Sequence, residues 1–249
     1  MAITLGDGES PAGPWRIVLF GELIALALEQ ASATVGRPLI LAVDGRAGSG
    51  KSTLAERLCL AHPNATVVHT DDLIGHSFFG WTELLIQGVL RPLWMGGAAR
   101  YLPPCPDLNG RRRPITVAVG TDLVVVEGVG ASRSDLRPWI DGSIWVQADV
   151  HEAERRWVDR DGGPEVVGVL RSEWMTEEIA FLAQDRPWER ASVIVAGTSI
   201  EAYDRNFEVL VASALKAWSN QDQTWSIGDG FPFREASTLP GTETPIRIE

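Results

Sequence analysis

The stretch of sequence that decides the fold is Gly45-Arg46-Ala47-Gly48-Ser49-Gly50-Lys51-Ser52. Its spacing is that of a phosphate-binding loop, G-x-x-x-x-G-K-[ST]. An apolar run at 38–44 precedes the loop and predicts a buried strand, and the run at 53–60 that follows predicts a helix. A glycine loop between a strand and a helix is the context in which this motif binds a nucleoside triphosphate.

The residue types in this loop explain that chemistry. Glycines allow backbone conformations that other residues avoid, so the loop can wrap a phosphate with its N–H groups pointing inward. Lys51 would reach the β- and γ-phosphates, and the Ser52 hydroxyl would ligate Mg²⁺. We therefore predict a site for ATP with Mg²⁺, although the loop alone does not separate ATP from GTP. The predicted nucleotide-binding residues are Gly45, Arg46, Ala47, Gly48, Ser49, Gly50, Lys51, Ser52 and Thr53.

The composition narrows the class of protein. The chain has 249 residues, 45% of them hydrophobic, which is enough for one large α/β domain. A net charge of −11 argues against broad nucleic-acid binding. The sequence shows no apolar run of membrane-spanning length, no secretory signal, and no disulfide or metal spacing of its two cysteines. We expect a cytoplasmic protein that binds a nucleotide and a small-molecule acceptor, without nucleic-acid or membrane partners; a homo-oligomer remains open.

The chain divides into three parts by pattern. Residues 1–14 are expected to form a flexible N-terminal tail, 15–218 a single α/β domain, and 219–249 a C-terminal extension. Short apolar runs alternate with helical segments in the domain, which predicts a parallel sheet covered on both faces. The runs are 39–43, 66–69, 123–126, 143–146 and 193–196, with 115–119 as an extra strand or the approach to the third. Helical patterns cover 15–35, 52–61, 81–96, 133–139, 150–160, 171–185 and 199–218.

Acidic residues follow two of the predicted strands. Asp71 and Asp72 come directly after the run at 66–69, and Glu127 ends the run at 123–126. Ligands of parallel α/β sheets bind beyond the carboxyl ends of the strands, so these acids are placed to serve a bound triphosphate. One carboxylate could accept a proton from an attacking hydroxyl, and another could hold Mg²⁺. The alternative for Asp71 and Asp72 is a helix N-cap or turn, and for Glu127 a solvent-facing strand end.

Three arginines lie on the predicted helix at 150–160. Arg156 and Arg160 are four residues apart and share a helix face, and Arg155 lies beside them. Guanidinium groups suit bidentate phosphate contacts, so this helix could act as a lid that closes on the phosphates and excludes water. The alternative is a solvated helix with Glu–Arg pairs.

Four motifs occur in an order that resembles a known family. They are Asp44–Ser52, Thr70–Leu73, Val126–Gly128 and Arg155–Asp161. This set resembles the uridine kinase and nucleoside/nucleotide kinase group of P-loop kinases, and most of all actinobacterial uridine kinase-like ATP-binding proteins, over residues 15–200. The resemblance implies a three-layer α/β/α P-loop fold with a five-stranded parallel sheet, nucleoside monophosphate kinase-like, with an arginine lid.

The resemblance also implies roles for individual residues. ATP with Mg²⁺ would be the donor, Asp71 the general base, and Glu127 a magnesium or acceptor-site acid. The implied catalytic residues are Asp71, Lys51, Arg156 and Arg160, the metal ligands are Ser52, Asp71 and Glu127, and Arg155 joins the nucleotide-binding set. Candidate acceptor-binding residues are Asp72, Trp81, Tyr101, Asp107, Arg111 and Glu127.

The acceptor region departs from the family pattern. Uridine kinases carry a Tyr-Asp pair followed by His and Arg, whereas here Tyr101 and Asp107 fit that pair only if the register shifts. Trp81 could stack on an acceptor ring, but a large aromatic residue more often packs in a core. We expect an ATP-dependent kinase that acts on a hydroxyl of a nucleoside, a nucleoside-like antibiotic or another hydroxylated metabolite. The alternatives are a nucleotide-binding regulatory protein and a degenerate relative that binds ATP without transfer. A GTPase is disfavoured because the sequence has no Asn-Lys-x-Asp motif.

Overall fold

A computed structural model describes residues 3–32, 36–75, 77–106, 110, 112–161, 164–198 and 202–213. Asp107, Arg111 and the predicted C-terminal extension at 219–249 lie outside these residues.

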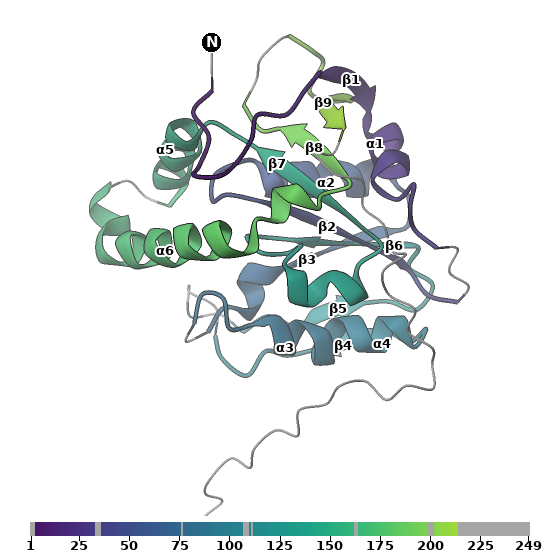
Figure 1. Cartoon of the computed structure of the whole chain (residues 1–249). Helices are drawn as coiled ribbons and strands as arrows, with labels where there is room; N and C mark the ends of the chain where they lie inside the picture. The colour runs from purple at the N-terminus through teal and green to yellow at the C-terminus, as the bar shows by residue number, and fades with distance from the viewer. Residues whose placement is uncertain are drawn as a thin grey trace, which may run out of the picture. The chain divides into compact units, whose positions relative to one another are not determined.

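The described residues form a seven-stranded main sheet. Its order is β1-β9-β8-β7-β2-β6-β3, and the five strands from β8 to β3 are all parallel to one another (Figure 1). These five strands coincide with the five apolar runs predicted from the sequence. The strands are β1 (Arg16–Leu19), β2 (Leu39–Gly45), β3 (Ala65–His69), β6 (Leu123–Glu127), β7 (Gly142–Gln147), β8 (Val193–Ala196) and β9 (Glu208–Ser213).

The expectation of a sheet with five strands in all is wrong, because two antiparallel strands extend one edge. β9 pairs with β8, and β1 pairs with β9. Their residues fall in segments that we predicted as helical, 199–218 and 15–35. The run Glu208–Ser213 contains only six residues with two valines and a leucine, and both faces of its Val209–Ala212 part are buried. Backbone pairing with β8 and β1, together with burial of both faces, overrides the weak helical pattern.

A second, two-stranded antiparallel sheet joins β4 (Ala99–Tyr101) to β5 (Ile115–Val117). The run at 115–119 is therefore partly a strand, but it belongs to this small sheet and not to the main one. Because β4 carries Tyr101, the small sheet positions one of the predicted acceptor residues.

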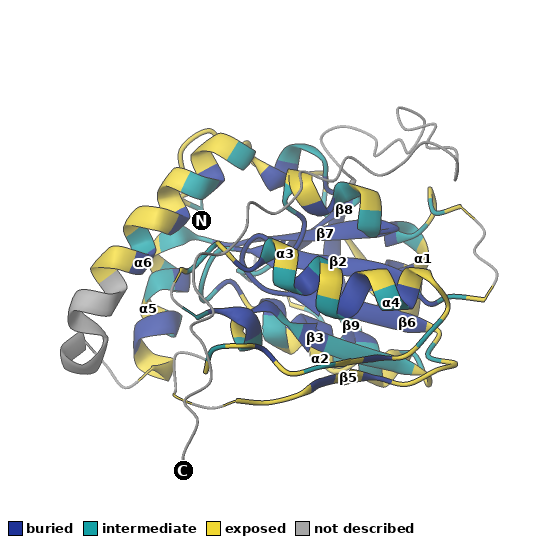
Figure 2. Ribbon diagram, turned by 90° about the horizontal axis from the view of Figure 1, so that it is seen from below, coloured by how far each residue is buried: buried dark blue, intermediate teal, exposed yellow. Residues whose placement is uncertain are grey.

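Helices cover both faces of the main sheet (Figure 1). On one face α1 and α2 pack against Leu41 and Val43 of β2. On the other face α3, the π-helix Ile86–Leu90 and α4 follow one another without a break and pack against Ile40 and Ala42. The alternation follows from the period of two in a strand. The sheet is buried in Figure 2, while the helices keep exposed outer faces. The helices are α1 (Phe20–Ala27), α2 (Lys51–Ala61), α3 (Thr82–Leu85), α4 (Arg91–Trp94), α5 (Val150–Arg160) and α6 (Pro164–Asp185).

The strand order creates a crevice at the carboxyl end of β2. The chain leaves β2 to form β3 on one side, with β6 returning between them, and later forms β7 on the other side. Ligands of open α/β sheets bind where the strand order reverses in this way. The loop at 45–50 begins at this point, so the topology places it at the mouth of the crevice.

The segment at 3–14 contacts the body of the domain. Trp145 Nε1 donates to Glu9 Oε1 at 2.7 Å, and the Ala12 amide donates to Gln147 Oε1 at 2.9 Å. The Glu9 carboxyl group is buried, and a buried carboxyl group without hydrogen-bond partners would be costly. The bond from Trp145 therefore holds Glu9 in place. These contacts fix Glu9 and Ala12 against β7. The flexibility expected of residues 1–14 stays a prediction. Among the described residues, no helix is both long and apolar enough to cross a membrane.

Candidate active site

The loop at 45–50 connects β2 to α2 and packs closely against α5. Lys51 Nζ donates to the Arg46 carbonyl at 2.9 Å, which draws the lysine across the loop. Gly48 has φ = +74°, and a Cβ atom at this position would lie 1.9 Å from the Ala153 carbonyl oxygen of α5. Only glycine combines this conformation with so close an approach. The loop is therefore held between its own helix and α5.

Asp44, the residue before the loop, fixes the two chain segments that border the crevice. Its Oδ1 accepts hydrogen bonds from the amides of Gly45 (2.7 Å) and Gly130 (2.9 Å). Its Oδ2 accepts from both the amide and the hydroxyl of Ser132, at 2.9 and 2.8 Å. Burial raises the pKa of Asp44, and these four bonds oppose that shift. Asp44 thus ties the end of β2 to the loop that follows β6.

Ser52, Glu127 and His69 form a hydrogen-bonded row across the crevice. Ser52 Oγ donates to Glu127 Oε1 at 3.1 Å, and Glu127 Oε2 lies 2.8 Å from His69 Nδ1. Burial alone would raise the pKa of Glu127, but His69 and Lys51 hold it below its ordinary value. The same hydrogen bond raises the pKa of His69. Glu127 is therefore a stabilised anion beside the loop serine.

Asp71 lies in a 3₁₀ turn, Thr70–Leu73, directly after β3. Its side chain is open to solvent in the crevice, yet desolvation by the surrounding protein and the charge of Glu127 raise its pKa. Lys51, Arg160 and His69 oppose this shift. The structure thus brings the predicted base, the predicted magnesium acid and the loop lysine into electrostatic contact. Asp72 is half-buried in the same turn.

The described residues show no arginine lid over the loop, contrary to the lid that we expected. Arg156 donates from Nη1 to the Gly197 carbonyl at 2.9 Å and pairs with Glu152 on its own helix. Arg160 pairs with Asp161 at 2.7 Å, and Arg155 is exposed. Ala153 and Trp157 are among the buried residues of α5, and its three arginines occupy the more exposed positions of the helix. Arg160 alone among them acts electrostatically on Asp71.

The predicted acceptor residues Trp81 and Tyr101 are both engaged in packing. Trp81 is 1% exposed and lies in the core that also contains Leu85 and Val126. This burial agrees with the alternative that Trp81 is a packing residue. Tyr101 packs its ring against Gly88, where a Cβ atom would lie 2.4 Å from the ring. Asp107 and Arg111 fall outside the described residues. The acceptor site therefore stays a prediction.

The sequence analysis missed one carboxylate at the loop, that of Glu178 on α6. Its Oε1 accepts a hydrogen bond from the Ala47 amide at 2.7 Å, and the side chain is 6% exposed. Burial raises the pKa of Glu178, against the opposing influence of the Ala47 bond, Lys51 and Arg46. No local signal could have found this contact, because 131 residues separate the partners. The carboxyl groups of Asp44 and Glu178 thus both accept hydrogen bonds from backbone amides of the loop.

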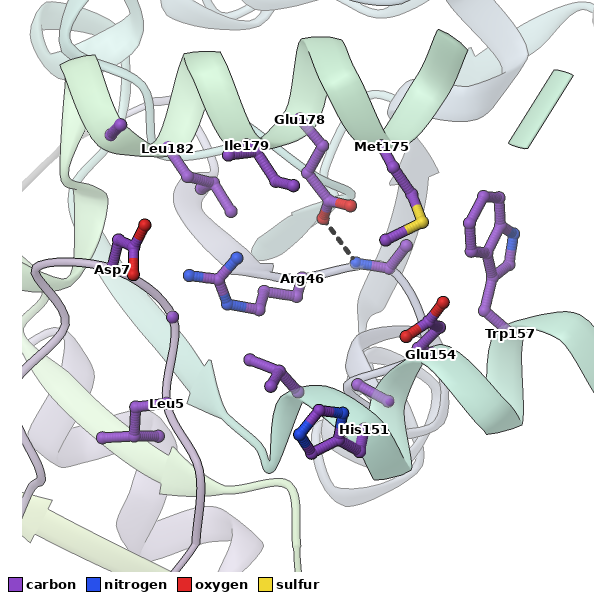
Figure 3. A pocket seen from close by; sticks show the side chains of 15 residues that line it. Leu5, Asp7, Arg46, His151, Glu154, Trp157, Met175, Glu178, Ile179 and Leu182 are labelled. Atoms are coloured by element: carbon purple, nitrogen blue, oxygen red, sulfur yellow. Dashed lines mark hydrogen bonds between the residues drawn. The ribbon is translucent and has the colours of Figure 1, made fainter. Parts of the chain in front are cut away.

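A cavity of about 290 Å³ lies beside the loop, between α5, α6 and the segment at 5–7. Figure 3 shows Arg46 extending into it, Glu178 and Met175 entering from α6, and Trp157 at its far side. Its lining is largely apolar, with polar side chains from Asp7, Arg46, His151, Glu154 and Glu178. The cavity therefore borders the loop at Arg46 and Ala47.

The residues at the crevice fit a magnesium ion that is shared with phosphates. The Ser52 hydroxyl and the Glu127 carboxylate are hydrogen-bonded neighbours, and oxygen atoms of this kind are the ligands that Mg²⁺ prefers. The described residues contain no group of three or more His, Cys, Asp or Glu side chains that could hold a metal ion alone. Such a set is not needed at a triphosphate, because Mg²⁺ binds there through one or two side chains plus phosphate oxygens and water.

The strand order, the loop between β2 and α2, and the acids at the strand ends define an α/β protein with a P-loop. No protein-family model matches the sequence, and no curated protein matches it. Among solved structures the chain is similar to a possible uridine kinase from Bacillus stearothermophilus, with 24% identity over 70% of this chain and 96% of that chain and a TM-score of 0.49. It is also similar to a putative fructose transport system kinase from Silicibacter sp. TM1040, with 18% identity over 68% of this chain and 91% of that chain and a TM-score of 0.48. A third similar structure, the YGR205w protein, is 12% identical over 64% of this chain and 85% of that chain, with a TM-score of 0.46.

Proposed function

We propose that this protein is an ATP-dependent kinase that transfers the γ-phosphoryl group to a hydroxyl of a small molecule. The observation that carries the proposal is the meeting of Asp71 and Glu127 with Lys51 and Ser52 at one edge of the sheet. A triphosphate site needs the lysine, the serine and one acid, and the second acid supplies a base for the acceptor. A nucleoside is the first choice of acceptor, followed by another hydroxylated metabolite or antibiotic.

The donor half of the site would hold ATP through the loop. Backbone amides at 46–50 and the α2 N-terminus would bind the β-phosphate, and Lys51 would leave the Arg46 carbonyl to reach the β- and γ-phosphates. Ser52 and Glu127, with Asp71 near them, would hold Mg²⁺, which when bound neutralises charge on the phosphate oxygens. Arg160 is the arginine best placed to add positive charge, since it already interacts with Asp71 and Glu127.

The acceptor half would centre on Asp71. Its carboxylate would orient the acceptor hydroxyl and take the hydroxyl proton as the oxygen attacks the γ-phosphorus in line. The bond between the γ-phosphorus and the β–γ bridging oxygen breaks as the new phosphate ester forms, and ADP leaves with that oxygen. A raised pKa makes the ionised Asp71 carboxylate a better proton acceptor than an ordinary aspartate.

Replacement of the base tests this assignment. We expect Asp71→Asn to keep ATP·Mg²⁺ binding and to lose about 100-fold or more of the transfer rate, the usual contribution of a general base. Binding is measured by calorimetry and transfer by ADP release. Asp122→Asn is the matched control, because Asp122 is exposed next to the opposite end of β6 and should turn over like the wild type. Unchanged turnover in Asp71→Asn would remove Asp71 from the mechanism.

The rate should also depend on pH in a predictable direction. The base works only when ionised, and the pKa of Asp71 is raised, so activity should fall on acidification at a higher pH than an ordinary aspartate would give. The measurement is kcat/KM against pH. An acid limb at or below the ordinary aspartate pKa would contradict the role of Asp71.

A panel of acceptors identifies the substrate class. Nucleosides, nucleoside monophosphates, hydroxylated antibiotics and small sugars or sugar acids are tested for stimulation of ADP release. One acceptor that raises ADP release at least tenfold above the rate with ATP alone supports the kinase. ATP binding without stimulation across the panel would favour the regulatory or degenerate alternative.

A further inference from the structure

His69 and Glu127 are the last residues of two neighbouring strands. β3 and β6 run parallel in a register that pairs His69 with Glu127 and, one residue earlier, Val68 with Val126. Val68 and Val126 pack into the core on the side of the sheet that α3 and α4 cover. Side chains alternate between the two faces of a strand, so His69 and Glu127 both lie on the face that α2 covers. Ser52, in the first turn of α2, is therefore on the same side of the sheet as this pair.

The backbone holds the ends of these two strands close together. Gly128 follows Glu127, and a Cβ atom there would collide with Thr70 Oγ1, which belongs to the residue after His69. Thr70 is buried, and the Gly128 amide donates to the Val43 carbonyl of β2 at 3.2 Å. The strand ends therefore have no room to separate, and the pairing of the two side chains is built into the sheet.

Each oxygen of the Glu127 carboxylate has its own donor. Ser52 Oγ donates to Oε1 at 3.1 Å, and His69 Nδ1 donates to Oε2 at 2.8 Å, because an ionised carboxylate can only accept. The rotation of a glutamate carboxylate about its last bond is broad when nothing restrains it. Donors on both oxygens restrain that rotation. Loss of the His69 bond would take this donor from Oε2 and leave the carboxylate free to turn away from Ser52.

The bond from His69 is compatible with a metal ion on the same carboxylate. A carboxylate has about four lone-pair sites on its two oxygens, so a donor at Oε2 leaves Oε1 able to bind an ion. His69 is not itself the expected ligand, because its Nδ1 faces Glu127 and Mg²⁺ prefers oxygen. Groups that orient a metal ligand in this way usually contribute roughly 10- to 100-fold to metal affinity.

We propose that His69 is a positioning residue for magnesium: its bond to Oε2 keeps Glu127 Oε1 beside the Ser52 hydroxyl, where the two oxygens would share the ion. This inference rests on the nucleotide-binding part of the proposed function and goes beyond it, because that function gives His69 no role. The carboxylate is already oriented before the nucleotide arrives, so less ordering is needed when Mg²⁺ binds.

The test measures how strongly Mg²⁺ enhances the binding of a non-transferable ATP analogue. Calorimetry gives the affinity with saturating Mg²⁺ and in EDTA, and the ratio of the two is the magnesium enhancement. His69→Val keeps a strand-forming side chain without the donor and should lose roughly tenfold or more of the enhancement. His69→Asn supplies an amide N–H close to the place of Nδ1 and should restore most of it. His151→Ala, at an exposed position on α5, should match the wild type.

The outcomes separate this inference from the proposed function. A loss of enhancement in His69→Val, with the EDTA affinity unchanged and recovery in His69→Asn, supports the inference. It is overturned alone if His69→Val keeps the wild-type enhancement, if affinity falls equally with Mg²⁺ and in EDTA, or if His69→Asn recovers nothing. Thermal unfolding checks the fold, and His69→Ala replaces His69→Val if the latter unfolds; the His69 side chain is 42% exposed, so its truncation should be tolerated. If the wild type binds the analogue under neither condition, the proposed function fails together with this inference.

Discussion

At the scale of single residues, three buried carboxyl groups hold the segments around the crevice together through hydrogen bonds. Asp44 accepts four hydrogen bonds, Glu127 joins Ser52 to His69, and Glu178 caps the loop. Each carboxyl group has donors arranged around it, as a polar group removed from water requires. The partners differ in kind, which explains why the pKa of Glu127 is lowered by His69 while burial dominates for Asp44 and Glu178.

Removal of the Asp44 carboxylate should destabilise the domain. Asp44→Ala leaves the amides of Gly45, Gly130 and Ser132 without their acceptor, at a cost of about 3 kcal/mol in the free energy of unfolding. Ser132→Ala removes one donor and should cost about 1 kcal/mol. Urea unfolding of both variants measures the difference. Equal losses would show that the Asp44 bonds to the backbone contribute little.

At the scale of elements, α5 packs against the loop and supports its conformation. It begins with an N-cap, since the Asp149 side chain accepts hydrogen bonds from the amides of His151 and Glu152. Its Ala153 carbonyl lies so close to Gly48 that no side chain fits between the loop and the helix. This packing places the backbone of α5, and not its Arg155 and Arg156 side chains, against the loop.

A methyl group at position 48 should separate these two elements. Gly48→Ala places Cβ 1.9 Å from the Ala153 carbonyl oxygen, so α5 must shift and nucleotide binding should weaken at least tenfold. Gly50→Ala is the matched control, because Gly50 also has a positive φ but a Cβ atom there meets no atom within 4 Å. Thermal unfolding of both variants should show the larger loss for Gly48→Ala, and calorimetry measures the loss of nucleotide binding in Gly48→Ala. Equal losses in the two variants would indicate backbone strain alone.

Across the whole described domain, contacts distant in sequence bring the site together. The segment at 3–14 reaches β7 through Glu9, which is 136 residues from Trp145. Arg37 and Asp141, 104 residues apart, form a two-point ion pair at 2.7 and 2.8 Å, and Asp141 also accepts from the Ile40 amide. Such pairs hold the N-terminal half of the sheet against its C-terminal half.

Loss of Glu9 tests whether the segment at 3–14 stabilises the domain. Glu9→Ala leaves the Trp145 indole N–H without an acceptor and removes a bond from Gln147, and we expect a loss of about 2 kcal/mol in the free energy of unfolding. Glu22→Ala removes an exposed pair with Arg16 and should change stability by less than about 0.5 kcal/mol. Chemical unfolding measures both. Equal small effects would favour the flexible tail predicted from the sequence.

The local parts of the site could be predicted because they are contiguous in the chain. The loop at 45–52 has a required backbone path, and the strand before it and the helix after it are visible as apolar patterns. The position of Asp71 and Glu127 beside the loop could be predicted because parallel strands end at a common edge, and their roles stay predictions. The helix predicted at 199–218 failed at β9, whose conformation depends on pairing with β8 and β1.

The primary structure alone was enough to specify the P-loop, the five parallel strands and the acids at their ends, because each is a short pattern with a local physical cause. The tertiary structure decided the two added edge strands, the orientation of the α5 arginines, the burial of Trp81 and the contact of Glu178 with Ala47. These features depend on packing between segments separated by up to more than a hundred residues, and no local periodicity encodes which segments will meet.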